Sequence, residues 1–237
     1  MMTMPQLLTA FTVLDFAALA LLGLCAVVIG WVVENPPARR PSVSTLMAAY
    51  RRDWMVQFVS RQPRIFDSNV VDSLRQSTAF FASACMIILG GGIAVIGNSE
   101  RLDSLAADLT LDVPGMVLEL KVVLVLLFVA NALLKFIWAH RLFGYCTIMM
   151  AAVPNDVDDP QALPRAAAAA EINITAARSF NRGLRSIYFA LGALGWLLGA
   201  YALLFTTLIT AAVLLRREFV SQSRLIIMTR PSDPPRP

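Results

Sequence analysis

The chain has 237 residues, of which 57% are hydrophobic and 15% are charged, and its formal net charge is +4. With a mean hydropathy of +0.65, it is too apolar for a soluble domain of this length, so we expect an integral membrane protein. The positive charge does not indicate nucleic-acid binding, because the arginines lie beside the ends of apolar segments.

The first two apolar segments are each long enough to cross a bilayer. Residues 11–33 contain only Asp15 as a charged residue, and residues 76–99 contain none. A helix of about 20 apolar residues matches the roughly 30 Å hydrocarbon layer. We therefore predict spans over about 11–33 and 76–99.

An amphipathic helix is predicted over about 43–61, between these two spans. Apolar and aromatic residues recur there at helical spacing, among them Tyr50, Trp54 and Phe58. Two placements are open for this helix. It can lie at the headgroup level as an interfacial helix, or it can pack against the cytoplasmic ends of the spans.

Two further spans are predicted over about 117–139 and 186–215. The last segment is uncharged for 30 residues, which is too long for one upright helix, whereas two crossings need about 40 residues. We expect one tilted or protruding helix there, with a re-entrant segment as the alternative. Residues 1–219 then form a single membrane domain, and the Pro-rich residues 220–237 form a disordered tail.

The distribution of basic residues predicts which side each connection faces. Residues 34–75 carry seven arginines and residues 140–185 carry five, so both connections are expected in the cytoplasm and both termini outside. The basic sequence after Leu215 conflicts with this orientation. A re-entrant passage that returns the C-terminus to the cytoplasm would remove the conflict.

Three ordered motifs resemble those of one family of multi-pass membrane proteins. They are Phe80-Phe81-Ala82-Ser83, then Lys135-Phe136-Ile137-Trp138 followed by Arg141 and Tyr145, and Asn181-Arg182-Gly183-Leu184-Arg185 followed by Tyr188-Phe189. With these motifs the chain resembles the domain-of-unknown-function family 599 from about Asp15 to the end of the fourth span. The resemblance implies a membrane architecture and no reaction.

The candidate functional residues are ionisable groups at the membrane edges. Seven basic residues are predicted at one cytoplasmic level, where they would form a rim for an anionic lipid or ligand: Arg75, Lys135, His140, Arg141, Arg178, Arg182 and Arg185. Lys135 could instead extend its ammonium to the interface without binding a ligand. Asp15 and Lys121 form a candidate intramembrane ion pair at the opposite side.

Glycines indicate a second type of site, where helices can approach closely. The candidate packing positions are Gly90, Gly91, Gly92, Gly195 and Gly199. They serve either packing within the bundle or an interface with a second copy or a membrane-protein partner. The glycines of the second span could also loosen it, as a transporter requires.

No catalytic, cofactor-binding or metal-binding constellation is recognised in the sequence. We therefore expect an all-α membrane four-helix bundle with an additional cytoplasmic interfacial amphipathic helix, in a cell membrane such as the bacterial inner membrane. Its expected role is that of a non-enzymatic scaffold or accessory subunit that contacts anionic lipids. The alternative is a small transporter or channel for an anionic or polar solute.

Overall fold

A computed structural model describes residues 11–98 and 115–229 of the chain. Within these residues every regular element is a helix, which confirms the predicted all-α class. Three helices are long and apolar enough to cross a membrane, namely α2 (Val13–Glu34), α4 (Ile65–Ile96) and α6 (Gly115–Ala151). The others are α3 (Val43–Ser60), α7 (Ala162–Ala193), the 3-10 helix η1 (Leu194–Leu198), α8 (Ala200–Phe219) and α9 (Gln222–Met228). The predicted disordered tail, residues 220–237, contains helix α9, and its residues 230–237 lie outside the described residues, as does the last residue of the second predicted span.

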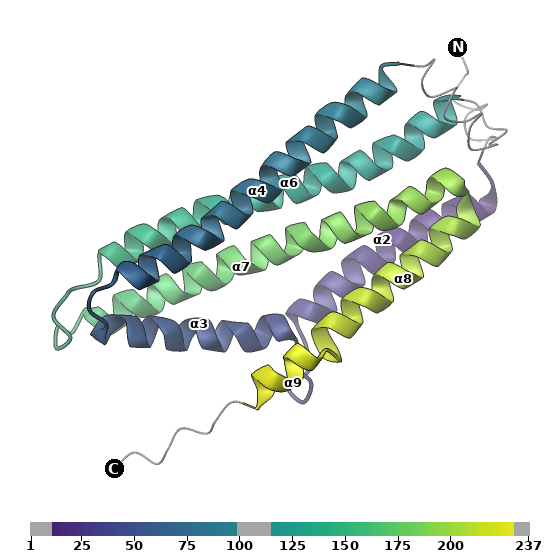
Figure 1. Cartoon of the computed structure of the whole chain (residues 1–237). Coiled ribbons are helices and arrows are strands. Elements are labelled where there is room, and N and C mark those ends of the chain that lie inside the picture. Colours follow the sequence, from purple (N-terminus) through teal and green to yellow (C-terminus); the bar gives the residue numbers. More distant parts are fainter. Residues whose placement is uncertain (1–10, 99–114, 230–237) are drawn as a thin grey trace.

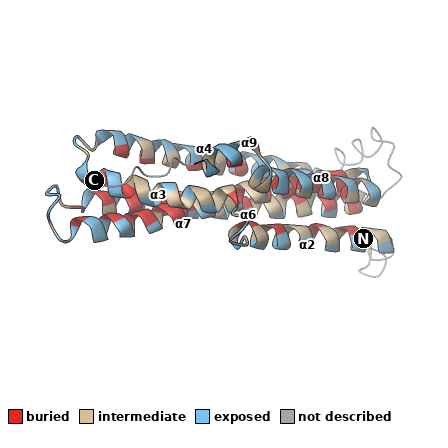
Figure 2. Cartoon of the chain, turned by 90° about the horizontal axis from the view of Figure 1, so that it is seen from below, coloured by how far each residue is buried: buried red, intermediate tan, exposed pale blue. Residues whose placement is uncertain are grey.

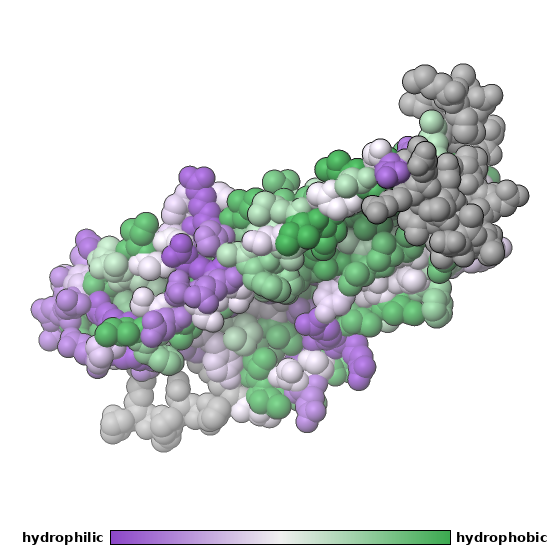
Figure 3. Space-filling model, turned by 45° about the horizontal axis from the view of Figure 1, so that its top comes forward, coloured by the Kyte–Doolittle hydropathy of each residue, from purple (hydrophilic) through white to green (hydrophobic). Residues whose placement is uncertain are grey.

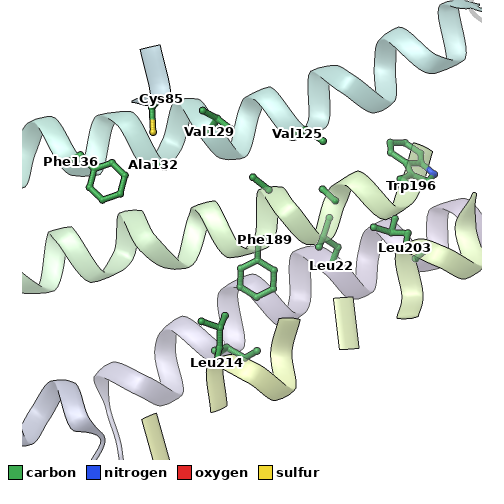
Figure 4. Close-up of a cluster of buried hydrophobic side chains, with 14 of the residues drawn as sticks. Leu22, Cys85, Val125, Val129, Ala132, Phe136, Phe189, Trp196, Leu203 and Leu214 are labelled. Atoms are coloured by element: carbon green, nitrogen blue, oxygen red, sulfur yellow. The ribbon is translucent and has the colours of Figure 1, made fainter. Parts of the chain in front are cut away.

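The helices form two halves that share α4, α6 and α7 (Figure 1). In the first half, here called the apolar half, α2 and α8 pack beside these three helices, around a core that includes Leu22, Val129 and Phe189 (Figure 4). In the second, the polar half, α3 packs on α7, and the core includes Met55 and Phe143. The surface follows the same division, because hydrophilic side chains gather over the polar half (Figure 3).

Local sequence signals explain where α2 and α3 begin. Thr12 caps α2, since its hydroxyl accepts from the Asp15 N–H at 3.2 Å while the Asp15 carboxylate accepts from the Thr12 N–H at 2.9 Å. Ser42 caps α3 by accepting from the Thr45 N–H at 3.2 Å, and its hydroxyl donates to the Val33 carbonyl at 2.8 Å. This second bond ties the start of α3 to the end of α2.

The single helix predicted over residues 186–215 is wrong. Helix α7 ends at Ala193, η1 follows, and α8 starts at Ala200 and runs back beside α7 and α2 (Figure 1). Gly199 makes this turn with φ +117°, a conformation that side chains other than glycine rarely adopt. The uninterrupted apolar run conceals the turn, because both arms of the hairpin are equally apolar.

Two glycines near the turn allow α8 to lie close to α7. The Thr206 hydroxyl donates to the Gly192 carbonyl at 2.7 Å. A Cβ at Gly195 would lie 2.9 Å from the Ala202 carbonyl oxygen, which is too close for any residue with a side chain. The hairpin therefore depends on small residues, of which Gly195 but not Gly192 was predicted as a helix-packing position.

Buried residues occur along the whole length of α7, among intermediate and exposed ones (Figure 2), and at Gly183 the neighbouring helix leaves no room for a side chain. A Cβ at Gly183 would lie 2.6 Å from the ring of Phe136, which is fully buried and stacks on Phe81 with 5.3 Å between ring centroids. Because the ring is held on several sides, it cannot move away at low cost.

Replacing Gly183 by Ala is therefore expected to lower the free energy of unfolding by about 2 kcal/mol, although Ala favours a helix. Gly144 is the matched control, because a Cβ there would meet nothing within 4 Å. Gly144→Ala is expected to stabilise the protein by up to about 1 kcal/mol. Unfolding in mixed detergent micelles measures both values, and changes of the same sign would contradict the predicted close contact.

Candidate functional site

A carboxylate and two guanidinium groups meet where α2 ends, at the boundary between the two halves. Glu34 accepts hydrogen bonds from Arg182, at 2.8 Å from Nε, and from Arg185. The two arginines are three residues apart on α7 and so share one face of that helix. The exposed fractions of the Glu34 and Arg185 side chains are 16% and 12%, so this ion pair is largely shielded from solvent.

A groove of about 420 Å³ lies on one side of these residues, here called the Lys135 groove. Its walls are α2 and α6, and its floor is α7. Lys135 and Asn131 of α6 line it together with Arg182, Arg185 and Glu34, and apolar residues continue it along α2 and α6. The Asn131 amide donates to the Ser186 hydroxyl at 3.0 Å, which places polar groups well inside the predicted third span.

A larger cavity of about 570 Å³ lies on the other side of Glu34 and Arg185. Residues of α3, α4, α6 and α7 line it. Five arginines and two glutamates line it: Arg51, Arg52, Arg178, Arg185, Arg217, Glu34 and Glu218. This cavity therefore has three more positive than negative charges in its lining, and Glu34 and Arg185 belong to both spaces.

The end of α8 closes the larger cavity through contacts with α3 and α7. Glu218 accepts from the Ser44 N–H at 3.1 Å and from the Ser44 hydroxyl. Arg217 donates to the hydroxyl of Tyr188. Further along the chain, the Arg224 side chain of α9 donates to the Pro41 carbonyl at 2.9 Å and is itself buried. The C-terminal helices are thus fixed at the α3 end of the molecule.

The outer side of α3 carries an exposed ion pair near this cavity. Arg52 Nε lies 2.6 Å from the carboxylate of Glu171, and more than half of each side chain is exposed. The hydrogen bond from Arg52 lowers the pKa of Glu171 below its ordinary value, and the nearby charge of Arg178 adds to this effect.

The structure brings together only part of the predicted basic rim. Lys135, Arg178, Arg182 and Arg185 line the two adjoining spaces. The other three members lie elsewhere. His140 Nδ1 is 3.1 Å from the Thr78 hydroxyl and 3.3 Å from the Arg75 carbonyl, between α4 and α6. Arg141 instead donates to the hydroxyl of Tyr145, one turn along its own helix.

Asp15 and Lys121 both contact Trp196, and they lie close enough for their charges to interact. The Trp196 indole N–H donates to the Asp15 carboxylate at 2.8 Å, and the Lys121 ammonium lies 5.8 Å from the centre of the Trp196 ring. Since Trp196 belongs to η1, these contacts hold the α7–α8 turn against the start of α2. Asp15 therefore caps a helix and anchors the turn.

The predicted glycine positions separate into three environments. A Cβ at Gly92 would lie 2.5 Å from Leu126, so Gly92 allows α4 to pack on α6. Gly90 and Gly91 face open space. Gly195 and Gly199 belong to the hairpin turn, as described above. An interface with another protein chain at these positions stays a prediction.

The sequence interpretation missed Glu34, Glu218 and Trp196, which organise the site and the turn. A signal for Glu34 was present, because it is the first charged residue after the first span and Arg182 and Arg185 are predicted at the same level. For Glu218 no comparable signal existed while α8 was taken as part of a single fourth span. Among the described residues, no group of three or more His, Cys, Asp or Glu could hold a metal ion.

Comparison with known proteins gives one match. A family described as "Protein of unknown function, DUF599" matches residues 17–223. No curated protein and no solved structure matches the chain.

Proposed function

Because the chain belongs to the DUF599 family, whose description names no activity, we propose a function from its structure: a non-enzymatic, multi-pass membrane scaffold or accessory subunit that binds anionic lipid headgroups at the boundary between its halves. The observation that carries this proposal is the set of cationic side chains that line the two adjoining spaces at that boundary.

In this proposal the apolar half crosses the bilayer five times. Helices α2, α4 and α6 each have the length and composition of a span. The second half of α7 and α8 up to Leu215 would add a hairpin beside them. Helix α8 as a whole has 20 residues, which corresponds to about 30 Å, so its charged end, which begins at Arg216, would reach the surface of the hydrocarbon layer.

The polar half then lies in the cytoplasm, next to a cell membrane such as the bacterial inner membrane, as the arginine-rich connections predict. The hairpin turns the chain back, so the basic residues Arg216, Arg217 and Arg224 fall on the same side as α3. The conflict between a basic tail and an external C-terminus disappears in this arrangement. Positive charge on one side of all five crossings supports it.

Anionic headgroups suit the boundary because it is positively charged and lies at the edge of the half that is proposed to cross the bilayer. Arginine presents a planar fork that binds phosphate through two hydrogen bonds. Each basic residue near an anionic bilayer surface contributes about 1 kcal/mol to the attraction. A structural role is favoured over transport, because the two cavities described above adjoin each other at the boundary and the apolar core around Phe136 is tightly packed.

The proposal is tested by removing the boundary charges together with their counter-ion. In the variant Glu34→Gln/Arg178→Gln/Arg182→Gln/Arg185→Gln, three positive charges and one negative charge are lost, so no carboxylate is left unpaired. The amount of anionic phospholipid that co-purifies in mild detergent, measured by mass spectrometry, is expected to fall several-fold.

A second variant controls for net charge. Arg39→Gln/Arg40→Gln changes the net charge by the same two units at exposed positions in the connection between α2 and α3. It is expected to retain the wild-type amount of anionic lipid. Equal retention by the two variants, or equal loss, would contradict a specific role of the boundary residues.

A further inference from the structure

We infer that the Lys135 groove is the binding site of one anionic phospholipid, with the phosphate at Lys135 and the start of an acyl chain between α2 and α6. This inference rests on the proposed function and narrows it to one site, one ligand class and one orientation.

The charged end of the groove contains a cation, Lys135, for which the described residues provide no counter-ion. Arg182 and Arg185 both donate to Glu34. The backbone carbonyl of Lys135 accepts from Ser179 at 3.0 Å, but its ammonium has no hydrogen-bond or ion-pair partner among the described residues. With three cations and one carboxylate, the lining has two more positive than negative charges, which fits an anionic group of low charge such as a phosphodiester.

The groove changes from charged to apolar in the direction of the apolar half. On α6, Asn131 and Phe128 lie one and two turns before Lys135, so the lining becomes apolar within about 10 Å of the ammonium. On α2, Gly30 and Ala26 precede Glu34 at the same spacing. A phospholipid has the same order of groups, a charged headgroup followed by a hydrocarbon chain. A free phosphate or a soluble anion has no apolar group that would occupy the apolar part of the groove.

The shape of the groove also fits a chain. Helices α2 and α6 are both held by α7, which leaves a channel between them over the α7 surface. At Gly30 a Cβ would meet nothing within 4 Å, so the wall of α2 is open at the point where the chain would pass. Trp31, 65% exposed beside Gly30, has the position of an aromatic residue at a membrane interface.

Two substitutions test the two ends of the site separately. Lys135→Gln removes the unpaired charge, and Gly30→Leu places a larger apolar side chain in the apolar part, at a position where a Cβ would meet nothing within 4 Å. Each is expected to weaken the binding of phosphatidylglycerol by about ten-fold, measured by native mass spectrometry of the protein released from nanodiscs. Phosphatidylcholine is expected to bind at least ten-fold more weakly than phosphatidylglycerol to the wild type.

Gly91→Leu is the matched control for Gly30→Leu. It introduces the same side chain on another predicted span, again where a Cβ would meet nothing within 4 Å. It is expected to leave the affinity unchanged. Glycerol phosphate, which carries the headgroup chemistry without chains, is expected not to displace the lipid at equal concentration.

The outcomes separate this inference from the proposed function. If the wild type binds phosphatidylglycerol and Gly30→Leu binds it equally well, the groove is not the site, although lipid binding at the boundary stands. Displacement by glycerol phosphate would also overturn the inference, since it would identify a site for a soluble anion. If the wild type does not prefer phosphatidylglycerol to phosphatidylcholine, both the inference and the proposed function fail.

Discussion

Replacing Glu34 by Gln is expected to reduce the free energy of unfolding by about 3 kcal/mol, because it leaves Arg185 without its counter-ion in a site largely closed to solvent. Gln keeps the size of the side chain, so the loss reports on charge and not on packing. Unfolding in mixed micelles of a denaturing and a mild detergent measures the difference. The same variant should separate the end of α2 from α7, since Arg182 loses its partner as well.

The matched control is Glu171→Gln, which breaks the exposed pair with Arg52. An exposed ion pair contributes less than about 1 kcal/mol, because solvent screens it. Since the pKa of Glu171 is lowered in the folded protein, any stabilisation from this pair is present above the ordinary carboxyl pKa and is lost as the pH falls through the lowered value. Equal effects of the two substitutions at neutral pH would contradict the shielding of Glu34.

A reporter enzyme that is active only in the cytoplasm is expected to be fully active when fused after Pro237. Helix α8 returns the chain to the α3 end of the molecule, where Glu218 binds Ser44 and Arg224 binds the Pro41 carbonyl. With α3 in the cytoplasm, the C-terminus lies there too. A single fourth span would place the same reporter outside and leave it inactive, so the two topologies predict opposite results.

A fusion after Asn98 provides the internal control. This position follows α4, at the opposite end of the molecule from α3, and the same reporter is expected to be inactive there. A reporter that requires export should give the reverse pattern at both positions. Activity of the cytoplasmic reporter after Asn98 would show that the orientation itself is inverted.

The sequence predicted the elements that carry a strong local signal. The helix expected over 43–61, from the helical spacing of residues such as Tyr50, Trp54 and Phe58, is α3, Val43–Ser60. Spans two and three were predicted at their apolar centres, but α4 and α6 continue far beyond them into the polar half. A hydropathy profile identifies the apolar part of a helix. It does not show how far the same helix continues with polar residues.

The turn at Gly199 and the pairing of the site residues could not be predicted in the same way. A glycine in an apolar run is as common in a continuous membrane helix as in a turn, and only the packing of α8 on α7 distinguishes the two. Once the turn was missed, Glu218 and Arg217 were expected at the end of the molecule opposite α3, whereas they lie beside α3. For Asp15 only the charge was considered in the sequence, so its capping contact with Thr12 and its hydrogen bond from Trp196 were not predicted.

Helices α4, α6 and α7 pass from the apolar half into the polar half without interruption, and α6 alone has 37 residues, which corresponds to about 55 Å. Such helices curve only gently, so each behaves as a nearly rigid rod. A bilayer that becomes thinner or thicker changes the tilt of the spans it contains. In the proposed five-crossing arrangement, we therefore expect the far ends of these helices, where Arg64 binds the carbonyls of Val153 and Pro154, to shift when the tilt of the spans changes.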